Sequence, residues 1–393
     1  MDNISVIQKQ ECSGCGACAQ VCPRSCIRMK PDKEGFLYPD LDSEACIRCG
    51  KCVRVCPVKN VNTHAALESC AAVNQNAEML KNSSSGAIFP LLAQTWIREG
   101  GYVCGAEMME DLTVKHTVTN TLDGLKRMQG SKYVQSDASG VYGEMKDLLD
   151  AGKKVMFVGT PCQASAVRNL FARNLEQMLL VDLICHGVPS QEFFRRHVNR
   201  TYPNRIGKVS FRDKTPCESS CYRLTVRSAA STRHIQPNRD AYYNLFLKSA
   251  SYRESCYGCR YAQAERAGDI TIGDCNTRGT YSCFPYAAEV STVLLSTPTG
   301  QRFWDKVKSE ALYCELDLPA EVKRNHQLRE PCKRPEIRDA VYLDFQNLPK
   351  KAFEKKYTYR LPLAQTVKRT VKNMVPLKVK GNMKKLCSAI RKG

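Results

Sequence analysis

The chain has 393 residues, of which 43% are hydrophobic and 25% charged, and its formal net charge at pH 7 is +20. This length allows two or three domains, and the composition excludes a disordered or fibrous protein. No apolar run is long enough to span a bilayer, and residues 1–10 lack a secretory signal, so we expect a cytoplasmic protein. In a reducing cytoplasm, 22 cysteines indicate metal or redox chemistry rather than disulfide bonds.

The N-terminal segment contains two similar cysteine runs, CSGCGACAQVCP at residues 12–23 and CIRCGKCVRVCP at residues 46–57. Each is C-x2-C-x2-C-x3-C-P, the pattern of bacterial two-cluster ferredoxins, in which the fourth cysteine of each run ligates the other cluster. Two identical four-cysteine runs disfavour zinc, which is the alternative. Cys26, the ninth cysteine of this segment, is not assigned as a cluster ligand. We assign one [4Fe–4S] cluster to Cys12, Cys15, Cys18 and Cys56, and the other to Cys46, Cys49, Cys52 and Cys22.

The following segment alternates between strands and helices. Apolar runs predict strands at residues 102–108, 154–159, 178–184, 269–274 and 291–297. Helices are predicted at residues 86–99 and after the second and third of these strands, the last one capped by Ser190. We therefore expect an α+β ferredoxin-like two-cluster domain followed by an α/β domain with a mixed, partly parallel sheet.

The expected domain boundaries are residues 1–62 for the two-cluster domain, 63–320 for the α/β domain and 321–393 for a basic C-terminal extension. The extension holds 20 Lys and Arg against 6 Asp and Glu, a net charge of +14. Such a charge suits an acidic redox protein, an anionic membrane surface or nucleic acid, or simply keeps the chain soluble.

Cysteines also follow two of the predicted strands. Cys162 in GTPC and Cys185 in ICHG each stand just past the carboxyl end of a strand, and these ends share one edge of an α/β sheet. The stretch SCYGC adds Cys256 and Cys259, which completes a set of four thiols. We predict a third [4Fe–4S] cluster there. Zinc with the same ligands, or a role as small core residues, stays open as an alternative.

Two polar segments are candidate cofactor sites. In KNSSSGAIFP, three serines and a glycine precede a helix, which suits a phosphate or the polar edge of a flavin but also an ordinary helix cap. QGSKYVQSD offers a cation, a stacking ring and hydrogen-bonding groups, or is a plain polar loop. The candidate cofactor residues are Ser83, Ser84, Ser85, Gly86, Lys132, Tyr133, Gln135, Ser136, Gly159 and Thr160. The candidate catalytic residues are Lys132 and His186, which could relay protons or be structural.

Together these stretches resemble the family of coenzyme F-420-reducing hydrogenase/dehydrogenase beta subunits, in its bacterial form with an N-terminal two-cluster ferredoxin domain. The resemblance covers about residues 1–300, and the matching stretches are SSSGAIFPLLAQTWIREGGYVCGAEM, KRMQGSKYVQSD, KVMFVGTPCQASAVR, LLVDLICHGVPS, VSFRDK, SCYGCRYA and DITIGD. It implies a flavoprotein with FAD beside a [4Fe–4S] cluster. Members without the ferredoxin segment still carry a cluster, which strengthens the assignment of the third site.

The resemblance also implies a path for electrons through the protein. Electrons would pass from a low-potential donor, such as an acidic ferredoxin, through the clusters to FAD and on to a small-molecule substrate. Lys132 would stabilise negative charge on the reduced flavin. The genes of many bacterial members lie among genes for surface polysaccharides. This suggests a link to surface-polysaccharide biosynthesis. The alternatives are an electron-transfer subunit without its own substrate, or a redox protein whose basic tail contacts a membrane or, less favoured, nucleic acid. The sequence predicts no oligomeric state.

Two positions depart from the family pattern. Ala87 stands where the family usually has glycine, and its methyl group could crowd a bound phosphate. Cys275 follows Gly-Asp where the family often has an aromatic residue, so it could be a substitute ligand or alter the substrate pocket.

Overall fold

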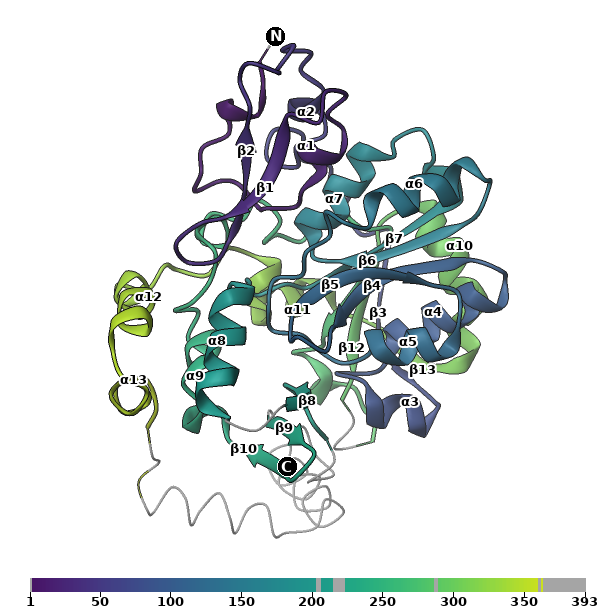
Figure 1. Ribbon diagram of the computed structural model, residues 1–393. Coiled ribbons are helices and arrows are strands. Elements are labelled where there is room, and N and C mark those ends of the chain that lie inside the picture. The colour runs from purple at the N-terminus through teal and green to yellow at the C-terminus, as the bar shows by residue number, and fades with distance from the viewer. Residues whose placement is uncertain (1, 203–205, 215–222, 286–288, 360–361, 363–393) are drawn as a thin grey trace.

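The computed structural model describes residues 2–202, 206–214, 223–285, 289–359 and 362. Figure 1 shows a small N-terminal unit, residues 2–62, at the top of the view and a larger body below it. We call these the ferredoxin unit and the body. In the described ranges, no helix is both long and apolar enough to cross a membrane.

The ferredoxin unit is built from two short helices and a hairpin. The helices are α1 (Ala17–Gln20) and α2 (Lys51–Arg54), and the antiparallel strands are β1 (Ile27–Pro31) and β2 (Leu37–Leu41). Each helix follows a glycine with a positive φ, Gly16 at 79° and Gly50 at 72°. Such a φ is accessible to glycine at little cost, so both cysteine runs turn sharply into a helix at the same point.

The body is organised around an eight-stranded sheet in the order β13-β3-β12-β11-β7-β6-β4-β5. The inner strands β4, β6, β7 and β11 are parallel, and the remaining pairs are antiparallel, so the predicted mixed sheet is confirmed. All five predicted strands are present, whereas β3, β5 and β13 were not predicted. The strands are β3 (Glu68–Asn74), β4 (Tyr102–Met108), β5 (Val114–Thr119), β6 (Val155–Gly159), β7 (Met178–Leu183), β11 (Ile270–Asp274), β12 (Ser291–Leu295) and β13 (Ala311–Glu315).

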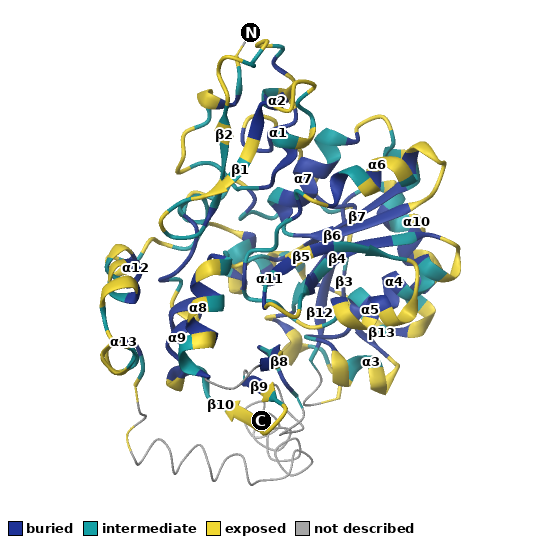
Figure 2. Ribbon diagram, viewed as in Figure 1, coloured by how far each residue is buried: buried dark blue, intermediate teal, exposed yellow. Residues whose placement is uncertain are grey.

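Helices cover both faces of this sheet, because its central strands are apolar on both sides. Met156 and Val158 of β6 pack with α4 (Ile88–Arg98), α5 (Leu122–Met128) and α10 (Pro298–Val307). Val155 and Phe157 of the same strand pack on the opposite face with α6 (Tyr142–Asp150) and α7 (Pro161–Leu170). Figure 2 shows β6 and β7 buried, with exposed residues on the outer side of α6.

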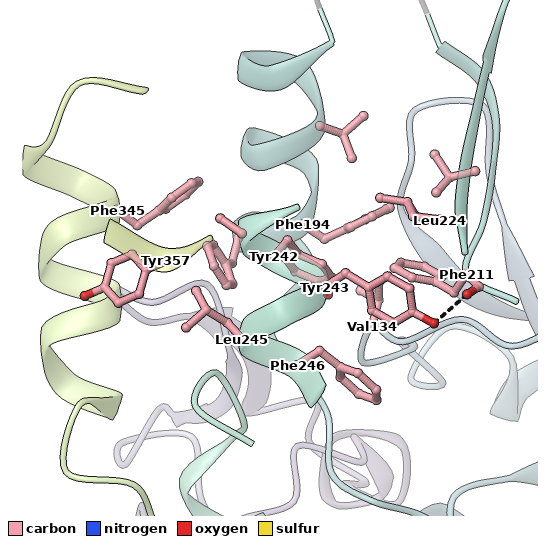
Figure 3. Close-up of a cluster of buried hydrophobic side chains, with 14 of the residues drawn as sticks. Val134, Phe194, Phe211, Leu224, Tyr242, Tyr243, Leu245, Phe246, Phe345 and Tyr357 are labelled. Carbon is pink, nitrogen blue, oxygen red and sulfur yellow. Dashed lines mark hydrogen bonds between the residues drawn. The ribbon is translucent and has the colours of Figure 1, made fainter. Parts of the chain in front are cut away.

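A second, aromatic core lies beside the sheet. Its helices are α8 (Gln191–Thr201), α9 (Ala241–Leu247), α12 (Arg338–Asn347) and α13 (Lys350–Tyr357), and its small sheet is β8 (Ile206–Ser210), β9 (Leu224–Ser228) and β10 (Thr232–Ile235). Phe193 of α8 packs edge-on against Phe345 of α12, with ring centroids 4.5 Å apart. Figure 3 shows how Tyr242 and Tyr243 of α9 fill the centre, and Tyr243 Oη donates to the Phe211 carbonyl.

The predicted domain boundary at residue 320 cuts through packed structure and is therefore corrected. It falls inside α11 (Leu318–Arg324), where Glu321 is fully buried and accepts the backbone N–H groups of Asn276 and Thr277. Further along, α12 and α13 contribute Phe345 and Phe353 to the aromatic core. Residues 321–357 thus belong to the body, and the rest of the basic tail from residue 363 lies outside the described residues.

The remaining elements are one α-helix, α3 (Ala77–Asn82), and short 3-10 helices. The 3-10 helices are η1 (Ile4–Val6), η2 (Leu175–Gln177), η3 (Pro237–Arg239), η4 (Glu254–Cys256), η5 (Arg278–Thr280), η6 (Lys308–Glu310) and η7 (His326–Leu328).

Candidate functional site

The cavity nearest the body in the ferredoxin unit, called the proximal cavity, has a volume of about 20 Å³ and is lined by Cys12, Cys15, Cys18 and Cys56. The first three cysteines come from the loop that enters α1 and from its first turn, whereas Cys56 follows α2. The structure therefore brings together the four thiols that the spacing assigns to one cluster.

A second cavity of the same volume, the distal cavity, is lined by Cys22, Cys46, Cys49 and Cys52. The two runs thus exchange their fourth cysteines, as the spacing predicts. Cys26 also lines this cavity, and its Sγ lies 3.2 Å from the Sγ of Cys22. A ninth cysteine therefore accompanies the predicted ligand set, although the spacing pattern gives it no place.

The third cavity is much larger, about 430 Å³, and lies at the carboxyl ends of β6 and β7. Cys162 is the second residue of α7, and Cys185 follows β7. Cys256 and Cys259 enter from η4 and the loop after it. The structure therefore places the four predicted thiols around one cavity. These residues meet because β6 and β7 are parallel neighbours whose carboxyl ends share an edge.

The cysteines around these cavities are not arranged to hold a single metal ion. Across the parts of the chain that the structure describes, no three His, Cys, Asp or Glu side chains converge closely enough to hold one metal ion. A zinc ion holds thiolates at about 2.3 Å, whereas a [4Fe–4S] cluster places eight atoms between its four thiolates. Cysteines that surround a cavity without converging on one point therefore fit the larger group.

Burial dominates the electrostatics of these thiols. It raises the pKa of Cys15 and Cys185 to about 12 and that of Cys162 to about 11, and the neighbouring cysteines raise these pKa values further. Four thiolates in such surroundings need positive charge close by, which a bound metal would supply because metal binding displaces the thiol proton.

The proximal and third cavities share a wall. Ser13, Pro57 and Val58 line both of them. Cys15 packs in the same apolar cluster as Ala166 of α7, the helix that begins beside Cys162. The distal cavity, in contrast, is lined only by residues 3–52 of the ferredoxin unit. The three cavities are therefore arranged in the order distal, proximal, third.

Arg253 fixes the ferredoxin unit to the body. Its side chain is 1% exposed, and it donates from Nε to the Cys12 carbonyl at 2.6 Å and from Nη2 to the Leu37 carbonyl at 2.8 Å. Nη1 also donates to Gln135 Oε1, while Gln135 Nε2 donates to the Ser13 carbonyl at 2.9 Å. The carbonyl groups of the proximal loop are thus held by body residues that also line the third cavity.

The ten predicted cofactor residues do not line a single cavity. Gln135 and Thr160 line the third cavity, while Ser83 and Ser84 line a smaller, separate one. The other six are Ser85, Gly86, Lys132, Tyr133, Ser136 and Gly159, and they line neither of these two cavities. The structure therefore divides these ten residues among different surroundings, and their role in cofactor binding stays a prediction.

Lys132 has a capping role in the structure. Its Nζ donates to the backbone carbonyls of Arg127, Met128 and Gln129 at 3.3, 2.6 and 3.0 Å, at the end of α5. Burial lowers the pKa of Lys132 to about 7, and Glu107 partly opposes this effect. The ammonium group therefore caps the end of α5 in this structure, and its contact with a cofactor stays a prediction.

Ser85 and Gly86 serve packing. Ser291 Oγ donates to Ser85 Oγ at 3.1 Å and accepts the Gly86 N–H at 3.0 Å. A Cβ atom on Gly86 would lie 2.4 Å from the Ala72 carbonyl oxygen, so the loop requires glycine to approach β3 and β12. Ala87 then adopts a left-handed conformation with φ of 57° and precedes α4. A glycine at this position in the family is thus explained by backbone conformation.

The remaining three residues also contact protein groups. The Tyr133 ring stacks on Phe246 in the aromatic core, with centroids 4.1 Å apart. Ser136 Oγ accepts from Gln163 Nε2 at 3.2 Å, and Gly159 lies over the Phe157 ring.

The smaller cavity, about 90 Å³, is called the basic cavity because five cations and one acidic residue line it. Its lining includes Lys81, Lys208, Arg212, Lys214 and Arg227 together with Ser83, Ser84 and Asp213. Ser83 is 5% exposed, and its Oγ is buried without a hydrogen-bond partner. An unsatisfied buried hydroxyl is costly, so a group with oxygen acceptors and negative charge, such as a phosphate, suits this cavity.

His186 and Cys275 differ in their relation to the third cavity. His186 lines it, and burial lowers the pKa of its imidazole, although the Asp274 carboxylate partly opposes this. Cys275 is fully buried and does not line the cavity; its Sγ lies 3.4 Å from Thr277 Oγ1. Cys275 is therefore not placed to act as a substitute ligand.

Residues 152–321 match the model of a family described as the C terminus of the coenzyme F420 hydrogenase/dehydrogenase beta subunit, and residues 11–60 match a "4Fe-4S dicluster domain". Both matches support a relationship to the family of coenzyme F420 hydrogenase/dehydrogenase beta subunits. It is similar to the F subunit of F(420)H(2) dehydrogenase from Methanosarcina mazei, at 24% identity over 358 residues, which cover 84% of this chain and 94% of the relative.

Among solved structures, this chain is similar to a chain of the F420-reducing [NiFe] hydrogenase complex from Methanosarcina barkeri. The identity is 17%, the match covers 68% of this chain and 92% of that chain, and the TM-score is 0.46. The match of residues 11–60 supports binding of clusters of the 4Fe-4S type in the ferredoxin unit, and the Methanosarcina mazei relative is a subunit of a dehydrogenase.

Sequence reasoning about this chain missed several residues of the site. Arg212 and Lys214 of the basic cavity lie within the stretch VSFRDK. Their positive charge could have indicated a site for an anionic group. Arg253 precedes SCYGC but carries no motif of its own. Cys332 lines the third cavity as a fifth cysteine, and its Sγ donates to the His186 carbonyl at 3.6 Å. No spacing pattern points to it.

Proposed function

We propose that this chain is an iron–sulfur flavoprotein oxidoreductase. Electrons from an acidic low-potential donor would pass through two [4Fe–4S] clusters in the ferredoxin unit to a third cluster in the body, and then through FAD to a small organic substrate. The observation that carries the proposal is the order of the cysteine-lined cavities, because the proximal and third cavities share Ser13, Pro57 and Val58. A continuous row of redox sites is what single-electron transfer requires.

The residues present fit three clusters. The proximal cluster would be held by Cys12, Cys15, Cys18 and Cys56, the distal cluster by Cys22, Cys46, Cys49 and Cys52, and the third by Cys162, Cys185, Cys256 and Cys259. Bound clusters supply one-electron transfer. Thr160 Oγ1 lies 3.2 Å from Cys162 Sγ, and a hydroxyl that donates to a ligand sulfur favours the reduced state of a cluster.

The residues also fit a flavin dinucleotide in part. The basic cavity, with the unpartnered Ser83 hydroxyl, suits a diphosphate, while Gln135 and Thr160 offer polar groups in the third cavity. Bound FAD accepts electrons singly and delivers them in pairs. His186 lines the third cavity, and its lowered pKa leaves the imidazole neutral near pH 7, so that it can accept a proton there.

The test is to measure iron, sulfide and flavin per chain in protein purified without oxygen. Three clusters give about 12 irons per chain, and Cys256→Ala/Cys259→Ala should retain about 8, because only the third site loses ligands. Cys332→Ala is the matched control, since it removes a thiol from the same cavity and should keep the full iron content. About 8 irons in every form, with no flavin, would contradict the proposal.

A second candidate function is that of an electron-transfer subunit that delivers electrons to a partner enzyme. It is favoured because the similar Methanosarcina mazei protein is described as a subunit of a dehydrogenase. The purified chain would then reduce an artificial dye but turn over no small metabolite, including surface-polysaccharide precursors. Added partner protein would restore turnover. Metabolite turnover by the chain alone would exclude this function.

A further inference from the structure

The rim of the distal cavity is basic and exposed. Arg24, Arg48 and Lys51 line the cavity and are exposed, and no acidic residue is among its lining residues. Ile47 lies among them with 59% of its surface exposed. In the described part of the chain these three cations form no ion pair, unlike Lys30 on β1, which pairs with Asp40 at 2.6 Å. We call these four residues, Arg24, Ile47, Arg48 and Lys51, the basic rim.

We propose that the basic rim is the docking surface for an acidic one-electron carrier protein, and that electrons enter this chain at the distal site. The inference rests on the proposed function, in which the distal cavity holds a cluster. In the transfer step, the reduced carrier loses one electron and the oxidised distal cluster gains it. No bond is formed or broken and no proton moves.

The exposure of the two ferredoxin-type cavities supports the distal one as the entry point. Three of the four predicted distal ligands are only half-buried, namely Cys22, Cys46 and Cys49. Three of the four proximal ligands are buried instead, and the proximal loop is covered by the body, since Tyr142 Oη donates to the Cys15 carbonyl at 2.7 Å. A carrier protein that docks from solvent therefore reaches the distal site first.

The composition of the basic rim indicates the charge of the partner. Redox proteins form small, transient interfaces, and complementary charge increases the rate of their encounter more than the final affinity. An exposed apolar residue surrounded by cations suits a partner with an acidic ring around its own cofactor. The net charge of +20 on the whole chain favours the same partner at longer range.

The experiment measures the rate at which an acidic plant-type [2Fe–2S] ferredoxin, reduced beforehand, transfers electrons to the full chain in stopped flow. Arg24→Glu/Lys51→Glu should lower the second-order rate constant about 10-fold or more at low salt and flatten its dependence on ionic strength. Lys153→Glu/Lys154→Glu is the matched control, with the same charge change at exposed positions before β6 of the body. It should keep the salt dependence of the unmodified chain.

Iron content and reduction by dithionite are measured on every variant, because they separate damage to the cluster from loss of docking. If Arg24→Glu/Lys51→Glu loses iron, the neutral variant Arg24→Gln/Lys51→Gln is measured in its place. It should show a smaller decrease in the second-order rate constant. An unchanged ferredoxin rate with full iron content would overturn the docking surface but leave the proposed electron path intact. Absence of clusters from the unmodified chain would instead overturn the proposed function itself.

Discussion

At the scale of single residues, buried charged side chains determine how the two parts of the molecule are held together. Arg253 contacts Cys12 and Leu37 of the ferredoxin unit, and its guanidinium lies 4.1 Å from the centre of the Tyr38 ring. Arg338 of α12 forms a similar contact, because its two terminal nitrogens each donate to the Glu34 carboxylate at 2.6 Å. Both arginines are almost fully buried, so their contacts exclude water.

We expect Arg253→Met to destabilise the folded protein by about 3 kcal/mol, because it leaves two buried carbonyl groups without their charged donor. The free energy of unfolding in urea would show this, and protease treatment would release the ferredoxin unit earlier. Arg173→Met, at an exposed position, is the control and should change stability by less than about 0.5 kcal/mol. Equal stability of the two variants would contradict the proposed contact role of Arg253.

The pair of His197 and Asp240 predicts a pH dependence of stability. Burial by itself would lower the pKa of His197. The Asp240 carboxylate, which lies 2.9 Å from Nε2, has a larger and opposite effect, so the pKa of His197 is raised. A raised pKa in the folded state gives stability that is complete below the ordinary histidine value of about 6.5 and is lost as the pH rises through the raised value. Asp240 has a lowered pKa, so its own contribution is lost only in acid.

The melting temperature of the unmodified chain should therefore decrease more steeply above pH 7 than that of His197→Gln, which cannot titrate there. Thermal unfolding followed by intrinsic fluorescence under nitrogen, from pH 6 to pH 9, measures the difference. Parallel curves for both proteins would show that this pair does not control the alkaline side of the profile.

At the scale of elements, the C-terminal helices are part of the body. α12 and α13 supply Phe345 and Phe353 to the aromatic core, and Gln346 of α12 donates to the Lys33 carbonyl of the ferredoxin unit at 2.9 Å. A deletion meant to test the basic tail for membrane or nucleic-acid binding must therefore begin after these helices. Of the basic extension predicted at residues 321–393, residues 363–393 lie outside the described residues, and the hypothesis that the tail binds a membrane or nucleic acid stays a prediction.

Deleting residues 331–393 should yield insoluble or cluster-poor protein, because it exposes the aromatic core around Phe193 and removes the contact of Arg338 with Glu34. Deleting residues 363–393 should preserve iron content and the melting temperature. Soluble yield, iron per chain and visible absorbance compare the two. A stable, cluster-loaded protein ending at residue 330 would contradict this view of the C-terminal helices.

At the scale of the whole molecule, the ferredoxin unit and the body form one redox path only if the proximal site connects them. Cys12→Ala/Cys18→Ala should remove the proximal cluster, so that electrons from a ferredoxin donor no longer reach the body and turnover falls to background. A small viologen dye should still reduce the third cluster directly, as its visible absorbance would show. Cys26→Ala is the control and should leave transfer intact. Undiminished ferredoxin-driven turnover would show that electrons bypass the proximal site.

The sequence alone determined the features that depend on local pattern. The two C-x2-C-x2-C-x3-C-P runs determined which cysteines group together, and apolar runs determined the five predicted strands, because ligand loops and strand burial are encoded over a few neighbouring residues. The pairing of Cys162 with Cys185 was also predictable, since both follow adjacent parallel strands. The strands β3, β5 and β13 were not predicted.

How distant segments of the chain meet is visible only in the folded molecule. The order distal, proximal, third, the contacts of Arg253, the position of Cys332 and the packing of α12 all depend on contacts between residues far apart in the chain. The structure also showed that Lys132 caps α5 and that Ser85 and Gly86 pack on β12, although a polar segment in sequence looks the same whether it faces a ligand or a helix end. A side chain's partner is set by the surface that folding brings against it, and local pattern carries no record of that surface.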